Sequence, residues 1–192
     1  MSVREVAVRA YREALPALAA SVVGGLFAGV VLGGMRAELR AVPGLLVLVP
    51  ALLATRGNVY GSLGARLSTG LHQGLVEPVL GYDERLAAAV AAALANGIVA
   101  SLFAAVVAFA VLVLLGQAVA PLFTLLAIAL VAGLLSGVAL TLAVVSVVVV
   151  GFRRGYDPDT LVGPLVTTTG DVFGVLFLLI AVRTVALVLG GV

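Results

Sequence analysis

Three charged side chains, those of Arg56, Asp171 and Arg183, interrupt long apolar stretches of this sequence of 192 residues. A charge near the centre of a bilayer costs about 2.5–3.5 kcal/mol on insertion scales, so each of them requires a reason. Eleven uncharged residues flank Asp171 on each side. Counted from a helix start near Asp159, Asp171 lies about 18 Å into a hydrocarbon core about 30 Å thick. A carboxylate at that depth is suited to hold a cation; the alternative is a structural pairing with Arg183 or with threonine hydroxyls.

The helical neighbours of Asp171 are polar or small. Thr167 and Thr168 lie one turn before it and Gly174 lies one turn after it, which makes a polar stripe on one face. Pro164 cannot donate a hydrogen bond to the preceding turn, and carbonyls released in this way are tolerated at membrane depth where they line a wet cavity. Carboxylate and carbonyl oxygens are the ligands that hard cations prefer. A plain kink is the alternative interpretation of the proline.

The sequence Asp157-Pro158-Asp159 has the residue types of a helix start. Asp157 suits the N-cap, Pro158 suits the first helical position, and Asp159 complements the helix dipole. Capping alone would explain these residues. The two carboxylates would also form an acidic entrance at the start of this helix, where cations are concentrated.

A second polar group lies between Thr55 and Ser62. Thr55, Asn58 and Ser62 fall on one helix face, at spacings of three and four residues. Asn58 is suited either to hydrogen-bond a hydrated ion or to bridge two helices. Catalytic residues are scarce, because cysteine is absent and the single histidine, His72, lies roughly 15 Å along the same helix from Ser62 and about 80° out of phase. We therefore do not expect an enzyme.

Membrane helices are the elements that must position these side chains. The chain is 63% hydrophobic and only 10% charged, with a mean hydropathy of +1.29, which excludes a soluble domain, a disordered chain and a nucleic-acid-binding domain. No charged residue occurs from 86 to 152, whereas one bilayer helix needs about 20 apolar residues. We predict an all-α polytopic membrane protein with five transmembrane helices, at about residues 15–35, 43–67, 86–116, 122–150 and 160–189.

The arginines predict how these helices are oriented. With the N-terminus in the cytoplasm, seven arginines lie in the inner segments and only two, Arg36 and Arg40, lie in the outer ones. Cytoplasmic loops carry an excess of positive charge, so this orientation is favoured. Five helices then place the C-terminus outside. We expect a multi-pass protein of the plasma membrane.

Two segments resemble helix signatures of the MgtE and solute-carrier-41 magnesium transporters. The second-helix signature is matched by Leu48-Val49-Pro50-Ala51-Leu52-Leu53, Gly57-Asn58 and Ala65-Arg66-Leu67-Ser68-Thr69. The fifth-helix signature is matched by Asp157-Pro158-Asp159, Pro164 and Thr167-Thr168-Thr169-Gly170-Asp171. Their order and separation also agree with those families.

The resemblance implies a homodimer of five-helix subunits, with a cation pathway at the interface lined by the second and fifth helices. The key carboxylate of the family, which holds a hydrated Mg²⁺, falls on Asp171, and its Gly-Asn pair falls on Gly57 and Asn58. The expected metal-site residues are therefore Asp171, Asn58, Thr167, Thr168 and Gly57, and the secondary candidates are Asp157, Asp159, Pro164, Ser62 and Thr55. Residues 1–192 would form a single transmembrane cation-transport domain with no soluble regulatory domain.

We predict transport of a divalent cation, with Mg²⁺ as the expected ion and the bilayer and a second copy of the chain as partners. A Na⁺- or H⁺-coupled exchanger or efflux protein would use the same residues. A non-transporting assembly subunit of a larger membrane complex is a further alternative, and it would show no cation flux by itself.

Overall fold

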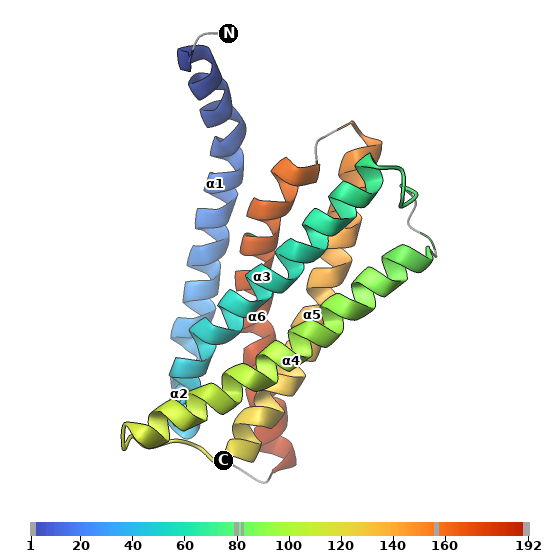
Figure 1. Ribbon diagram of the computed structural model, residues 1–192. Coiled ribbons are helices and arrows are strands. Elements are labelled where there is room, and N and C mark those ends of the chain that lie inside the picture. Colours follow the sequence, from blue (N-terminus) through green and yellow to red (C-terminus); the bar gives the residue numbers. More distant parts are fainter. Residues whose placement is uncertain (1–2, 79–80, 82, 156–157, 190–192) are drawn as a thin grey trace.

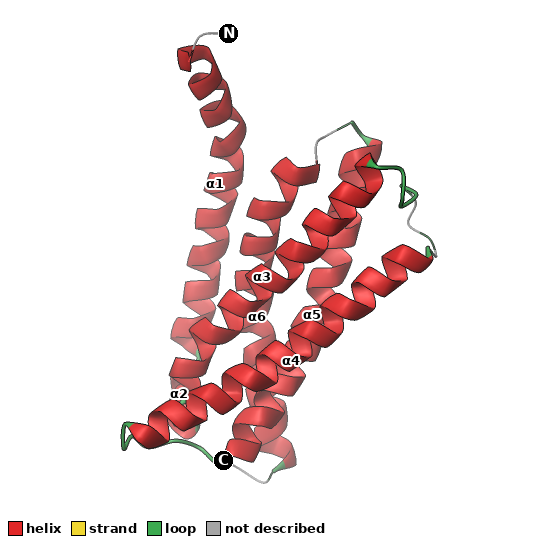
Figure 2. Cartoon of the chain, in the orientation of Figure 1, coloured by secondary structure: helices red, strands yellow, loops and turns green. Residues whose placement is uncertain are grey.

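The computed structural model describes residues 3–78, 81, 83–155 and 158–189, and every regular element in these ranges is a helix (Figures 1 and 2). This confirms the predicted all-α class. The helices are α1 (Val3–Gly34), α2 (Arg36–Ala41), α3 (Leu45–His72), α4 (Glu84–Leu114), α5 (Leu122–Arg153) and α6 (Pro158–Val188).

Four of the described helices are long and apolar enough to cross a membrane. They are α3, α4, α5 and the part of α6 from Val162 to Val188. A shorter apolar stretch, Leu18–Gly34, forms the second half of α1. The predicted polytopic membrane protein is thus confirmed, with four to five membrane-capable helices. The first half of α1 carries charged residues and extends beyond the rest of the bundle (Figure 1).

Local sequence signals fix where the helices begin and end. The side chain of Asp83 accepts a hydrogen bond from the backbone N–H of Leu86 at 2.8 Å, which caps the start of α4. Gly116 follows the end of α4 with φ +64°, a left-handed conformation that glycine adopts without strain. The chain then turns, and α5 begins after Pro121.

Helix α6 occupies the centre of the arrangement, where it packs against α1, α3 and α5. Helix α4 packs against α3 and α5 on the side away from α1 (Figure 1). Because α3 contacts both α4 and α6, its two flanks face different neighbours. The short helix α2 joins α1 to α3 and contacts the end of α6.

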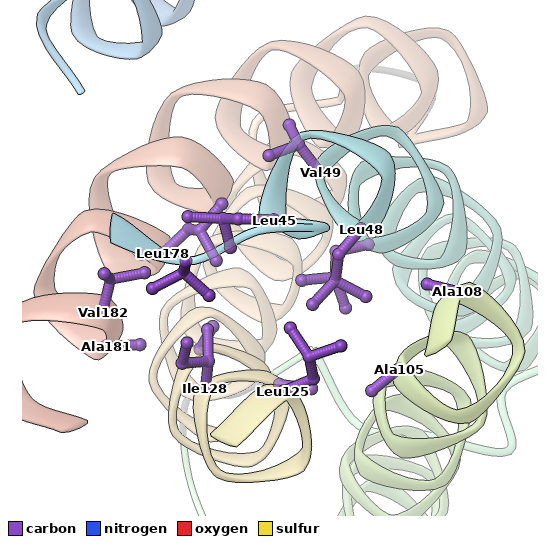
Figure 3. Packing of buried hydrophobic residues seen from close by; sticks show 14 of the residues in the cluster. Leu45, Leu48, Val49, Ala105, Ala108, Leu125, Ile128, Leu178, Ala181 and Val182 are labelled. Atoms are coloured by element: carbon purple, nitrogen blue, oxygen red, sulfur yellow. The ribbon is translucent and has the colours of Figure 1, made fainter. Parts of the chain in front are cut away.

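Two apolar clusters fill the bundle, one toward each end. The first contains Leu45, Leu48 and Leu52 of α3 with Leu125 and Ile128 of α5 and other buried residues (Figure 3). The second contains residues further along α3, among them Tyr60, Leu63 and Leu67, together with Leu140 and Val144 of α5.

Between the two clusters, α3, α4, α5 and α6 each contribute small or polar residues, which we call the middle layer. Close packing of apolar side chains holds the two ends of the bundle together, so the middle layer is where polar side chains can be placed without breaking either cluster. Its residues are Arg56, Gly57, Asn58, Gly97, Ser101, Gly133, Ser136, Gly137, Thr167, Thr168, Gly170, Asp171 and Gly174.

Candidate functional site

The carboxylate of Asp171 lies in the middle layer, in a pocket between α3 and α6. Asp171 is partly buried. The pocket has a volume of about 220 Å³ and is lined by Leu53, Ala54 and Gly57 of α3 and by Val166, Thr167, Gly170 and Asp171 of α6. We call it the Asp171 pocket. Small residues on both helices leave the space into which the acid can point.

Thr167 adds a hydroxyl oxygen to the Asp171 pocket. Its Oγ1 donates to the carbonyl of Gly163 at 2.9 Å, one turn earlier in α6. Because the hydroxyl proton is used on the backbone, the oxygen lone pairs remain available as acceptors. The pocket therefore offers oxygen atoms to a cation or to the water molecules around one.

Thr168 lies on another side of α6 and packs against α1. Its hydroxyl hydrogen-bonds to Ser21 of α1 at 3.0 Å and also donates to the carbonyl of Pro164 at 2.8 Å. Gly24 of α1 has no side chain at the point where Thr168 approaches it. Of the two threonines named from the sequence, the structure places Thr167 with Asp171 and Thr168 at the α1 contact.

Asn58 and Ser62 line a different pocket, of about 330 Å³, between α3 and α4. Arg66 of α3 and Asn96 of α4 complete its polar lining, so we call it the Asn58 pocket. Within one chain, adjacent residues of α3 thus face two pockets, Gly57 the Asp171 pocket and Asn58 the other one. Thr55 lines neither of these two pockets, and its hydroxyl donates to the carbonyl of Leu52 at 2.9 Å.

The secondary candidates near the start of α6 lie outside the Asp171 pocket or outside the described residues. Pro164 is partly buried within α6, which continues past it without interruption. Asp159 belongs by its backbone to the first turn of this helix, and Asp157 lies outside the described residues.

No group of three or more His, Cys, Asp and Glu side chains gathers anywhere in the described part of the chain. Among the described residues that line the pocket, a cation at Asp171 would meet one carboxylate, that of Asp171 itself, with the Thr167 hydroxyl beside it. Mg²⁺ keeps several waters and is commonly bound through one or two carboxylates, so such a donor set is sufficient for a hydrated ion.

Arg183 is exposed near the end of α6, where its Nε donates to Oε1 of Glu38 in α2 at 2.9 Å. The alternative in which Arg183 pairs with Asp171 is therefore wrong, because the two residues lie three turns apart and Glu38 supplies a carboxylate at the helix end. Asp171 remains without a contact from this arginine.

Two residues of the middle region were not assigned a role from the sequence. Arg56 is only 3% exposed, and its Nη2 donates to the carbonyl of Ala132 on α5 at 3.3 Å. Asn96 lines the Asn58 pocket. The sequence shows both as polar residues within apolar stretches. It does not show which residues of other helices they contact.

Comparison with known protein families matches residues 49–181 to the MgtE family, which is described as a divalent cation transporter. The matched range contains the middle layer and both pockets. No curated protein and no solved structure matches the chain.

Proposed function

The chain belongs to the MgtE family of divalent cation transporters, and from this premise we propose that it carries Mg²⁺ across the plasma membrane through a pathway between two copies of the chain. As a member of this family it is a membrane transporter of divalent cations and not an enzyme. In this proposal residues 1–192 act as one transport domain, and α3 and α6 of each copy line the pathway.

The observation that carries the proposal is the Asp171 carboxylate in a pocket between α3 and α6. The pocket measures about 220 Å³, and a water molecule occupies about 30 Å³ in the liquid, so a cation fits together with several of its waters. Its polar lining consists of the Asp171 carboxylate and the Thr167 hydroxyl, which suit the preference of Mg²⁺ for oxygen ligands. We propose Asp171 as the group that holds the ion, with Thr167 accepting hydrogen bonds from its hydration shell.

A second copy of the chain is supported by the exposed face of α3. From Val99 to its end, the neighbouring helix α4 exposes mostly bulky apolar residues, such as Phe103 and Val106. From Pro50 onward, helix α3 instead exposes small and polar residues at helical spacing, which suit close contact between helices or contact with water better than contact with lipid chains. These residues are Pro50, Ala54, Asn58, Ser62, Ala65 and Thr69.

The glycines beside this face support the same interpretation. A Cβ added at Gly57 or Gly61 of α3 would meet no atom within 4 Å, and the same holds for Gly163 and Gly170 of α6. Packing within one chain therefore does not require glycine at these positions. Close approach of a second backbone, or of a hydrated ion, would require it. In this arrangement Asn58 lies beside Gly57 at about the depth of Asp171, but on the α4 side of α3.

The orientation proposed from the sequence places the N-terminus in the cytoplasm. Arg66 lies toward the end of α3 that precedes the α3–α4 connection, and Arg153 and Arg154 lie at the end of α5. Arg36 and Arg40 both lie in α2, at the opposite end. The excess of positive charge at the first end supports its cytoplasmic location.

Flux measured in liposomes that contain the purified chain tests this function. We expect Mg²⁺ to enter in the absence of any opposing Na⁺ or H⁺ gradient, and Mn²⁺, Co²⁺ and Ca²⁺ serve as comparison ions. Entry that strictly requires an opposing gradient would identify a coupled exchanger. Absence of flux for all four ions would contradict the proposal and favour an assembly subunit.

Cysteine cross-linking tests the interface, because the chain contains no cysteine of its own. We expect single cysteines at Ala54 and Ala65, on the exposed face of α3, to form disulfide-linked dimers in the membrane. A cysteine at Ala110, exposed on α4, is the matched control and should remain monomeric. A cysteine at Gly29 of α1 probes a competing face, since added side chains there also meet open space. Cross-linking at Gly29 or Ala110, without any at Ala54 and Ala65, would contradict the proposed interface.

A further inference from the structure

The Asn58 pocket continues into a second pocket that runs toward the end of α3. This second pocket has a volume of about 350 Å³ and is lined by residues between Ser62 and Gln73 and by Leu75, beyond the end of the helix. Ser62 and Arg66 line both pockets, so the two form one groove, which we call the Arg66 groove. It lies on the flank of α3 away from the Asp171 pocket, and the proposed ion site does not use it.

Polar side chains follow the Arg66 groove along one side of α3 at intervals of three or four residues, and all of them are exposed. They are Asn58, Ser62, Arg66, Thr69 and Gln73. Asn58 lies at about the depth of Asp171, and Arg66 lies about 12 Å closer to the end of the helix. Half of a hydrocarbon core about 30 Å thick is about 15 Å, so the groove leads from the membrane centre to its boundary. There the long side chain of Arg66 can reach the lipid headgroups.

Helix α4 supplies the opposite wall of the Asn58 pocket and runs antiparallel to α3 (Figure 1). Its lining residues are small, and all but one are apolar. They are Ala89, Ala92, Ala93, Asn96 and Ala100. Further along, α4 exposes the bulky apolar side chains of Phe103 and Val106. The wall therefore leaves space near the membrane boundary and continues as apolar surface.

A second guanidinium lies at the same end of the Arg66 groove. Arg85 precedes Ala89 by one turn of α4, and its Nη1 donates to the carbonyl of Leu75 at 3.1 Å. Because Leu75 lines the groove, this hydrogen bond holds Arg85 beside it. No acidic residue is among the described residues that line the groove, so its charge suits an anion and not a cation. The acidic residues between the two arginines in sequence lie outside the lining: Glu77, Asp83 and Glu84.

We infer that the Arg66 groove binds an anionic phospholipid, such as phosphatidylglycerol, with the phosphate at Arg66 and Arg85 and an acyl chain along the alanines of α4. Basic pockets between membrane helices on the cytoplasmic side bind the headgroups of anionic lipids. In the orientation proposed above, this end of α3 is cytoplasmic, so the lipid belongs to the inner leaflet. The hydroxyls of Thr69 and Ser62 are positioned to donate to phosphate and ester oxygens. This lipid site is separate from the ion site at Asp171.

The lining distinguishes an anionic phospholipid from two related ligands. A zwitterionic headgroup carries an ammonium group, which the two guanidiniums repel and for which the described lining offers no carboxylate. A free phosphate ion would occupy only the arginine end of the groove. The remaining length of about 12 Å toward Asn58, with its alanine wall, matches the apolar part of a lipid and has no counterpart in a phosphate ion.

Native mass spectrometry of the purified chain in detergent, with phosphatidylglycerol or phosphatidylcholine added, tests the inference. We expect the wild-type chain to retain phosphatidylglycerol in preference to phosphatidylcholine. Arg66→Gln and Arg85→Gln should each weaken phosphatidylglycerol binding about fivefold, since each removes one positive charge near the phosphate. Arg154→Gln is the matched control, because Arg154 is exposed at the end of α5 and lines neither pocket of the groove. It should change binding by less than twofold.

A second variant fills the groove without changing its charge. Ala92 is exposed and lines the Asn58 pocket, so Ala92→Leu places a larger side chain where the lipid would lie. We expect severalfold weaker phosphatidylglycerol binding. Ala91→Leu, at an exposed position of α4 outside the lining, is its control and should bind as the wild type does. This pair decides the question if the arginine variants do not fold.

Equal retention of the two lipids by the wild-type chain would overturn the inference, and so would an equal loss of phosphatidylglycerol in Arg154→Gln and Arg66→Gln. Displacement of phosphatidylglycerol by soluble glycerol phosphate would identify a site for free phosphates instead. Loss of the dimer in Ala92→Leu with unchanged lipid binding would show that a second copy of the chain fills the groove. Bound lipid is measured without any ion flux, so these outcomes are independent of the proposed transport.

Discussion

The pockets on the two flanks of α3 differ in charge more than in size. The Asp171 pocket contains a carboxylate and a hydroxyl, whereas the Asn58 pocket contains two amides, the hydroxyl of Ser62 and the guanidinium of Arg66. Only the first can attract a cation by its own charge. The larger pocket, on the α4 side, is therefore the less suitable one for a cation, and charge rather than volume distinguishes the two.

Filling the Asp171 pocket should have the largest effect of the three changes that test this comparison. We expect Gly57→Leu to reduce Mg²⁺ flux in liposomes by about a hundredfold, because the new side chain enters the space beside Asp171. Its Cβ meets no atom within 4 Å, and leucine favours a helix over glycine by roughly 0.5–1 kcal/mol, so the chain should still fold. Normal flux in Gly57→Leu would show that the ion does not pass this point.

Removing one hydroxyl from the Asp171 pocket should have a smaller effect. We expect Thr167→Val to lower Mg²⁺ flux about tenfold, since the valine cannot accept a hydrogen bond from the hydration shell of the ion. Asn96→Ala removes a polar group from the Asn58 pocket and is the matched control, with an expected change of less than twofold. A larger loss in Asn96→Ala than in Thr167→Val would reverse the assignment of the two pockets.

Glu38 lines neither of the two pockets, so its replacement serves as the control in which Mg²⁺ flux should not change. A hydrogen bond from its own backbone, followed by the neighbouring Arg183, lowers the pKa of Glu38 below its ordinary value of 4.5. A lowered folded-state pKa stabilises the fold above the unfolded pKa, and this contribution is lost as the pH falls through the folded pKa.

We expect Glu38→Gln to leave Mg²⁺ flux unchanged and to lower stability by less than about 1 kcal/mol at pH 7, because the Arg183 side chain of the pair is 65% exposed and solvent screens its charge. Thermal unfolding of the purified protein at pH 7 and at pH 3 measures this. The difference between wild type and variant should be smaller at pH 3 than at pH 7, because the contribution of the carboxylate is lost as the pH falls through its lowered folded-state pKa. A difference of equal size at both pH values would show that Glu38 does not stabilise the fold through its charge.

The helical class and the position of Asp171 within a membrane-capable helix could be predicted from the sequence because both depend on local patterns. A run of apolar residues long enough to cross a bilayer is visible without a structure, and so is a single acid in the middle of one. The family match over residues 49–181 agrees with the resemblance that the signatures around Gly57-Asn58 and Asp171 indicated.

The grouping of side chains into pockets could not be predicted, because it depends on which helix packs against each face. Gly57 and Asn58 are adjacent in sequence, yet α6 borders one and α4 borders the other. Thr167 and Thr168 both lie one turn from Asp171, but α1 contacts only the second through Ser21.

Arg183 and Arg56, in the predicted fifth and second helices, also show that the surroundings of a side chain depend on helix packing and cannot be predicted from local sequence. Arg183 lies near a helix end, where a long side chain can reach water and Glu38. Arg56 lies in the middle layer, where neighbouring helices enclose it. Sequence marks both as charges in apolar surroundings, and only the packing separates an exposed ion pair from a buried guanidinium.

Mg²⁺ flux through Asp171→Asn in liposomes, measured beside the wild-type chain and Asp83→Asn, is the most direct test of the ion site. Asp83 caps α4, and asparagine caps a helix about as well, so this control removes a carboxylate without removing the cap. We predict that Asp171→Asn abolishes flux while Asp83→Asn retains it. Flux through Asp171→Asn at the wild-type rate would contradict the assignment of the ion to this carboxylate.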